Sequence, residues 1–287
     1  MKKTLLTALA AVMAFSINAQ IETPAPSPAG SVYSKVGLTD VTIEYSRPKV
    51  KGRKIFGEGS DFLQPYGQLW RAGANAGSKL IISTDITFGG TAVKAGEYLI
   101  FATPGKDEWS VSLYSDISLG GNVGGYDKSK EVALATVKPR TLSTPVEVLT
   151  YNISDISDDN TTAAIELRWS DVSVKVPIKV DFDAQVMASI EANTKVNPGN
   201  YVAAANYYLA AGKDLNQALK WMDMYLAVGE NSKQFWHVHT KAQIQAKMGD
   251  KKAAKETATK SMELAKASPN GDFGYVKRNE DLIASLK

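Results

Sequence analysis

Residues 172–186 read VSVKVPIKVDFDAQV, and two hydrophobic periods meet in this stretch. From Val172 to Val180 every second residue is apolar, and the residues between them are polar except for Pro177. This alternation is typical of a strand with one buried face. Pro177 lies on the outward phase and predicts that this strand is at a sheet edge. After residue 183 the apolar period changes to about 3.6, as in an amphipathic helix. The pattern therefore predicts a β-rich N-terminal part and a helical C-terminal part.

Short strand-like segments also fill the sequence before this border. Val41, Ile43 and Tyr45 alternate with polar residues, and Gly89-Gly90 separates two apolar runs as a hairpin turn would. Turn-forming residues recur about every 8–12 residues, which is typical of antiparallel sandwiches and barrels. We predict an antiparallel β-sandwich domain over residues 31–181.

The segment after the border has the pattern of packed helices. Leu215, Ala218 and Met222 fall on one face of a helix, and Asp214 precedes them as an N-cap. We expect five or six helices between residues 183 and 286.

A faint repeat runs through these helices. Ala205 and Gly212 are seven residues apart, and so are Ala242 and Gly249. A small residue lets two helices approach closely, and a glycine turns the chain between them. The repeat resembles a degenerate tetratricopeptide helical hairpin, whose period is about 34 residues. The predicted fold class is therefore segregated α+β, a β-sandwich followed by a tetratricopeptide-like helical bundle over residues 183–287.

The N-terminus has the pattern of an export signal. Lys2 and Lys3 precede an apolar stretch over residues 5–17, and Ala19 offers a cleavage point. This stretch is shorter than the about 20 residues of a membrane span, which makes an uncleaved anchor the less favoured alternative. We predict a signal peptide over residues 1–19 and a Pro-rich leader over residues 20–30, followed by no membrane span. The mature protein would be periplasmic or secreted.

The composition excludes several kinds of chemistry. The chain has no cysteine, which excludes thiol catalysis and cysteine-based zinc sites. Its formal net charge of +3 falls to 31 basic against 30 acidic residues once Lys2 and Lys3 are removed, so nucleic acid is not an expected partner. The two histidines, His237 and His239, point to different sides of a helix and cannot bind one metal together. We predict no catalytic residue, no metal site and no cofactor.

Two further segments contain residues that functional loops often use. Gly120–Gly125 is rich in glycine, but no helix follows it as in a phosphate-binding loop. Asp155, Asp158, Asp159 and Asn160 cluster between two strands. A polar turn explains the cluster better than a calcium loop, because its spacing fits no defined calcium motif.

The best candidate site lies between residues 47 and 75. Trp70 supplies a flat apolar face, while Arg71 and Asn75 supply directional hydrogen-bond donors. Proteins use this combination of side chains to recognise sugars or carboxylates. Arg47 and Arg53 belong to a basic run that could bind an anionic group. We take these five residues as the candidate ligand-binding set. The structural alternative places Trp70 in the core, Arg71 on loop carbonyls and Asn75 in a turn.

These segments resemble a bacterial family defined only by sequence, the domain-of-unknown-function family 2911. The resemblance is carried by SRPKVKGRKIFG, PYGQLWRAGANA, VKAGEYLIFATPGKDEWSV and VEVLTY, and it covers about residues 31–181. It implies an exported protein with a mostly β domain, often followed by helical repeats. It implies no reaction and no role for any residue.

Two functions are compatible with this sequence. The first is a non-catalytic binding or scaffold protein of the cell envelope, with a glycan or anionic small ligand at the β domain and a peptide or protein partner at the helical repeats. The second is an envelope carbohydrate hydrolase that uses paired carboxylates. Two acidic side chains facing a cleft beside Trp70 would favour the enzyme, and a pocket without them would favour binding.

Overall fold

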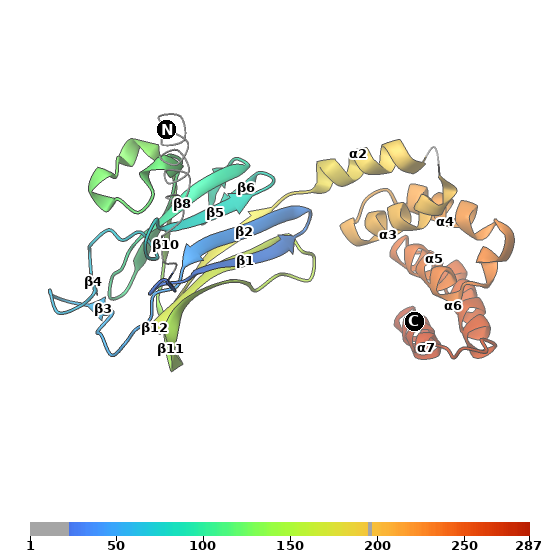
Figure 1. The fold of residues 1–287 in the computed structure, drawn as a ribbon. Helices are drawn as coiled ribbons and strands as arrows, with labels where there is room; N and C mark the ends of the chain where they lie inside the picture. The colour runs from blue at the N-terminus through green and yellow to red at the C-terminus, as the bar shows by residue number, and fades with distance from the viewer. Residues whose placement is uncertain (1–22, 195–196) are drawn as a thin grey trace, which may run out of the picture. The chain divides into compact units, whose positions relative to one another are not determined.

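The computed structural model describes residues 23–194 and 197–287, and the predicted signal peptide lies outside these ranges (Figure 1). The chain forms two compact units, with the border between Phe182 and Asp183. The N-terminal unit is built from antiparallel sheets and the C-terminal unit from helices, so the predicted segregated α+β class is confirmed.

Two sheets form the body of the N-terminal unit. The larger has the order β1-β2-β5-β8-β9-β10, with strands β1 (Ala29–Val36), β2 (Thr39–Ser46), β5 (Ser78–Ile82), β8 (Gly96–Thr103), β9 (Trp109–Tyr114) and β10 (Glu131–Val137). The smaller has the order β11-β12-β6-β7, with strands β11 (Arg140–Ser154), β12 (Thr162–Val180), β6 (Ile86–Phe88) and β7 (Thr91–Val93). Two short strands, β3 (Phe56–Gly57) and β4 (Gln64–Pro65), pair in parallel beside them.

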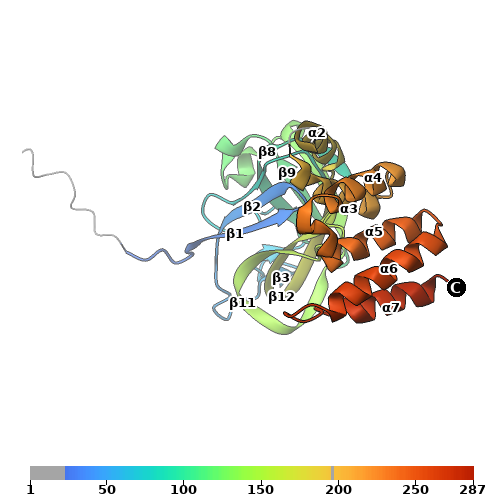
Figure 2. The same cartoon turned by 90° about the vertical axis from the view of Figure 1, so that its right-hand side faces the viewer.

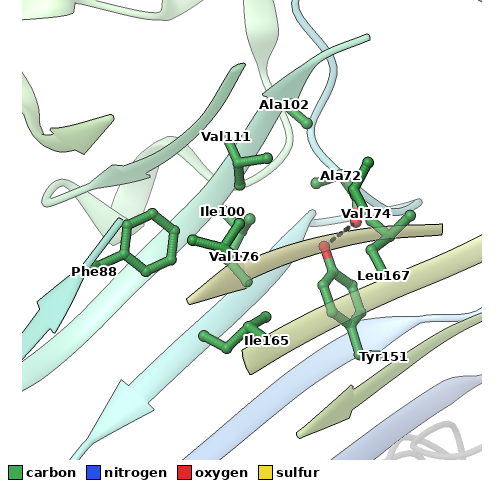
Figure 3. Close-up of a pocket in the computed structure, with 10 residues that line it drawn as sticks. All are labelled: Ala72, Phe88, Ile100, Ala102, Val111, Tyr151, Ile165, Leu167, Val174 and Val176. Atoms are coloured by element: carbon green, nitrogen blue, oxygen red, sulfur yellow. Dashed lines mark hydrogen bonds between the residues drawn. The ribbon is translucent and has the colours of Figure 1, made fainter. Parts of the chain in front are cut away.

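The alternation of apolar residues places the core between the two sheets. Val41, Ile43 and Tyr45 of β2 are buried, while Thr42 and Glu44 between them are more exposed. The inner faces of both sheets contribute to one hydrophobic cluster. Figure 3 shows its centre, where a cavity of about 10 Å³ is left among apolar side chains. Such a space holds about one water molecule, so this cavity is too small for a larger ligand.

The long element β12 turns back on itself. The φ angle of Ser170 is 55°, and the amide of Val180 donates to the carbonyl of Thr161 at 2.9 Å, which brings the two ends of the element together. The edge position predicted from Pro177 is wrong, because β12 lies between β11 and β6. Proline is tolerated there because β6 has already ended, and only the amide of Gly89 reaches the Pro177 carbonyl.

A second, smaller apolar cluster lies against the larger sheet, on strands β8 and β9. Leu99, Phe101 and Tyr114 are buried there, and Tyr126 packs against them. Tyr126 belongs to the segment between β9 and β10, which contains the 3₁₀ turns η1 (Ile117–Leu119), η2 (Val123–Gly125) and η3 (Lys128–Lys130). The Tyr126 hydroxyl donates to Glu131 at 2.6 Å. The tyrosine therefore anchors the glycine-rich loop to the sheet.

The C-terminal unit contains six α-helices among its described residues, within the predicted range. They are α2 (Asp183–Thr194), α3 (Tyr201–Ala211), α4 (Leu215–Leu226), α5 (Phe235–Lys247), α6 (Lys251–Lys266) and α7 (Tyr275–Ser285), with the 3₁₀ turns η4 (Pro198–Asn200) and η5 (Gly229–Lys233). Figure 2 shows α5, α6 and α7 side by side. Asp214 caps α4 by accepting from the amides of Asn216 and Gln217, as predicted.

The repeated small residues lie where helices meet. Ala205 and Ala242 are fully buried, and Gly212 and Gly249 have φ angles of 65° and 86° after the ends of their helices. A left-handed backbone at a helix end favours glycine, which explains the repeat physically. The tetratricopeptide-like assignment itself stays a prediction. No described helix has the length and apolar character that crossing a membrane requires.

Candidate functional site

The N-terminal unit has an open pocket of about 300 Å³ where several loops meet. Four of the five predicted binding residues line it, namely Arg53, Trp70, Arg71 and Asn75. Arg47 does not line the pocket. The fold thus brings the basic run and the Trp-Arg cluster to one surface, although they are separated by β3 and β4 in the sequence.

Trp70 forms the floor of the pocket rather than an open stacking surface. Only 4% of the residue is exposed, and its ring stacks on Trp169 with centroids 5.8 Å apart. The rings of Phe56 and Trp109 form T-shaped pairs with it, with centroids 5.7 and 6.5 Å from the Trp70 centroid. Its indole N–H donates to the carbonyl of Gly73 at 3.0 Å. These contacts match the structural alternative for Trp70, because the ring is already covered by other aromatic residues.

Arg71 and Asn75 form one wall and are held by each other. The Nη1 atom of Arg71 donates to the Asn75 carbonyl at 2.9 Å. Asn75 has a φ angle of 56°, and its side-chain amide donates to the Ser46 hydroxyl and the Ser27 carbonyl at 3.1 and 3.2 Å. No described residue accepts from the other guanidinium nitrogens of Arg71. They remain available to a ligand.

Arg53 closes a tight turn in the basic run. Its Nε atom donates to the Val50 carbonyl at 3.0 Å, and Nη2 donates to the Lys49 carbonyl at 2.5 Å. Lys51 and Gly52 have φ angles of 49° and 70° within this turn. The guanidinium is therefore fixed by backbone carbonyls, which leave its charge unneutralised.

Arg47 lies elsewhere, near the start of β1. Its amide donates to the Pro28 carbonyl at 2.9 Å, and its side chain packs close to Gly30. The Nε atom is buried and has no hydrogen-bond partner among the described residues. Arg47 therefore helps to hold the segment before β1, and it is separate from the pocket lining.

The glycine-rich loop belongs to the pocket, which sequence reasoning missed. Val123 lines the pocket, and Gly121 packs directly against the Arg71–Asn75 pair. A Cβ atom on Gly121 would lie 2.3 Å from the Asn75 carbonyl oxygen and 2.8 Å from the Nη1 atom of Arg71. Only glycine fits there. The signal in the sequence was the glycine itself, but it did not reveal which distant segment approaches it.

The pocket is rich in hydrogen-bond donors. None of the described residues that line it is an aspartate or glutamate, and neither Arg53 nor Arg71 forms a salt bridge with a described residue. Trp169 also lines the pocket, and its buried indole N–H has no described acceptor. This arrangement favours a ligand group that carries negative charge or accepts hydrogen bonds.

The acidic cluster between β11 and β12 forms a polar turn. Asp159 accepts from the hydroxyl of Ser157 at 2.6 Å and from the amide and hydroxyl of Thr161 at 3.0 and 2.8 Å. Asp155 pairs with Lys175 at 2.6 Å. Within the described ranges, no three histidine, aspartate or glutamate side chains gather closely enough to hold a metal ion.

Comparison with known proteins assigns the chain to a family but does not assign it an activity. A family model described as "Protein of unknown function (DUF2911)" matches residues 27–178, which is more than half of the chain. No curated protein and no solved structure matches the chain.

Proposed function

We propose that this chain, which belongs to the DUF2911 family of proteins of unknown function, is a non-catalytic binding protein whose β unit holds a small anionic ligand. The ligand would occupy the pocket between Arg53 and Arg71. A carboxylate or another oxyanion suits it, because guanidinium groups recognise such groups with paired N–H donors.

One observation carries the proposal: two arginines line the same pocket, and none of its described lining residues is acidic. Some cations of the unit pair with acids, as Lys79 does with Glu44 and Glu97 and Lys94 does with Asp85. The two pocket arginines instead donate to backbone carbonyls. Their side chains are thereby ordered before a ligand arrives, which lowers the entropy cost of binding.

The same lining argues against the other sequence-based hypotheses for this site. Hydrolysis by two carboxylates needs a pair of acids facing the ligand, and no acid of the described ranges lines the pocket. Sugar binding commonly uses an exposed aromatic face, and the Trp70 ring is covered by Trp169 and Phe56. An anionic ligand therefore fits better than a neutral glycan.

Export and partner binding complete the proposal. The N-terminal pattern of Lys2, Lys3 and the apolar stretch supports an exported protein that works in the periplasm or outside the cell. The helical unit would supply a surface for a peptide or protein partner, by analogy with helical repeats.

A thermal-shift experiment on residues 20–287 tests the anion site. Acetate, phosphate and sulfate are compared with chloride at equal ionic strength, and a neutral oligosaccharide serves as the competing ligand class. A ligand that binds only the folded state raises the melting temperature. We expect an oxyanion to raise it in the wild type and to lose this effect in Arg71→Gln and Arg53→Gln.

Lys51→Gln is the matched control, because Lys51 lies in the same turn as Arg53 and does not line the pocket. It removes one positive charge from the same surface. An equal loss of the shift in Lys51→Gln would reveal non-specific attraction and overturn the proposal. A shift caused by the oligosaccharide alone would also overturn it.

A further inference from the structure

A second polar site lies in the helical unit, between α5 and α7. Its central residue is His239, which is 7% exposed. The Nδ1 atom of His239 lies 2.7 Å from Oδ1 of Asn279, which is fully buried. This contact engages one of the two ring nitrogens of the buried histidine and leaves the other, Nε2, to be placed.

A chain of hydrogen bonds determines where the imidazole proton sits. The Ser261 hydroxyl donates to the Phe235 carbonyl at 2.7 Å, so its oxygen is left to accept. The Asn279 amide nitrogen donates to that oxygen at 2.9 Å and to the Tyr275 carbonyl at 2.7 Å. Because carbonyls only accept, Oδ1 of Asn279 must be the acceptor for His239. The proton is therefore on Nδ1, and Nε2 of the neutral ring carries a lone pair.

This lone pair has no hydrogen-bond partner in residues 23–194 and 197–287. No described residue forms a hydrogen bond with Nε2, and the ring of His239 lines an open pocket of about 480 Å³. Nδ1 is engaged with Asn279, so Nε2 is the nitrogen left to the pocket. Burial lowers the pKa of His239, which keeps the ring in its neutral, accepting form.

Other groups around this pocket are also acceptors. The Thr240 hydroxyl donates its proton to the Trp236 carbonyl at 3.2 Å, and the Ser285 hydroxyl donates to the Leu282 carbonyl at 2.6 Å. Both oxygens are left with lone pairs only. Asp281 adds a carboxylate on the same pocket, with Lys277 as its partner on the helix surface.

We propose that the pocket between α5 and α7 binds a primary ammonium group. Such a group has three N–H donors and no acceptor, which complements His239, Thr240 and Asp281. Arg278 also lines the pocket, with its guanidinium 4.8 Å from the centre of the Tyr275 ring. Its positive charge repels an ammonium ligand and offsets the negative charge of Asp281. Recognition therefore depends on N–H donation to the neutral acceptors and on a charge-assisted hydrogen bond to Asp281.

The first test uses NMR on residues 20–287 labelled with ¹⁵N. The two ring nitrogens of His239 should show the tautomer with the proton on Nδ1 at neutral pH. n-Butylammonium should then perturb the signals of His239 and Thr240 in a saturable way. Tetramethylammonium has the same charge without N–H donors, and butyrate has the opposite charge. Neither should bind. The opposite tautomer, or equal binding of tetramethylammonium, would overturn the proposal.

Asp281→Asn tests the carboxylate, with Asp223→Asn as the matched control. Both aspartates are exposed acids paired with a lysine of the same unit, but Asp223 does not line the pocket. Asp281→Asn should weaken n-butylammonium binding by about tenfold, as the loss of a charge-assisted hydrogen bond implies. Equal affinities of the two variants would contradict the site.

Two natural sources could supply the ammonium group, a free polyamine or a lysine side chain. Putrescine and a short lysine-containing peptide distinguish them in the same titration. Tighter binding of either than of n-butylammonium identifies the source and supports the site. Binding of neither overturns the proposal. Both arms are independent of the anion pocket, because Arg53 and Arg71 belong to the other unit.

Discussion

Replacing Trp70 by alanine should destabilise the β unit far more than replacing its neighbour Arg71. Trp70 is buried among Phe56, Trp109 and Trp169, so its removal leaves a cavity that costs about 3–5 kcal/mol. The lost indole hydrogen bond to Gly73 adds about 1 kcal/mol, because the carbonyl is left unpaired. The sum is a large share of the about 5–15 kcal/mol that stabilises a typical domain.

Arg71 differs because its side chain is half-buried and donates one hydrogen bond, to the Asn75 carbonyl. Arg71→Ala should therefore cost only about 1–2 kcal/mol. Urea unfolding followed by tryptophan fluorescence and by far-ultraviolet circular dichroism measures both variants. Trp70→Phe is the matched control for packing, and it should retain most of the aromatic contacts while losing the N–H.

The reasoning is refuted if Arg71→Ala costs as much as Trp70→Ala. Arg71 would then be a determinant of the fold, and the anion pocket would lose one of its two supports. A small cost for Trp70→Ala would show instead that the aromatic cluster can repack around the missing ring. In that case the interpretation of Trp70 as the floor of the pocket would be wrong.

Four other predictions follow from single features. Gly121→Ala should abolish the oxyanion-induced thermal shift, because a Cβ atom would displace the Arg71–Asn75 pair, whereas unchanged binding would contradict the role of the loop. Hydrogen bonds from Ser157 and then Thr161 lower the pKa of Asp159 from 3.8 to about 2. The stability that these bonds add is therefore present above pH 3.8 and is lost as the pH falls through about 2. A carboxyl titration followed by NMR measures this pKa. Residues 31–181 expressed alone should give dispersed NMR spectra, and an unfolded fragment would show that the helices complete its core. N-terminal sequencing of the envelope fraction should begin near Gln20, and an intact Met1 in a membrane pellet would contradict export.

The candidate site was only partly accessible to sequence reasoning. Residue types selected Arg53, Arg71 and Asn75, which do line one pocket. They could not separate Trp70 as a binding surface from Trp70 as a core residue, because the same ring serves both purposes. Its stacking partner, Trp169, comes from β12 far along the chain. Long-range contacts of this kind leave no local period in the sequence.

The amino-acid pattern by itself determined the segregated architecture and the inner face of β2 and of the second half of β12. Burial on one side imposes a period of two on a strand and about 3.6 on a helix, and both periods are local properties of the chain. Tertiary structure alone decided that β12 doubles back at Ser170, that Gly121 presses on Arg71, and that Asn279 directs the proton of His239. Each of these depends on segments that meet only after folding, where close packing and hydrogen-bond direction leave one arrangement.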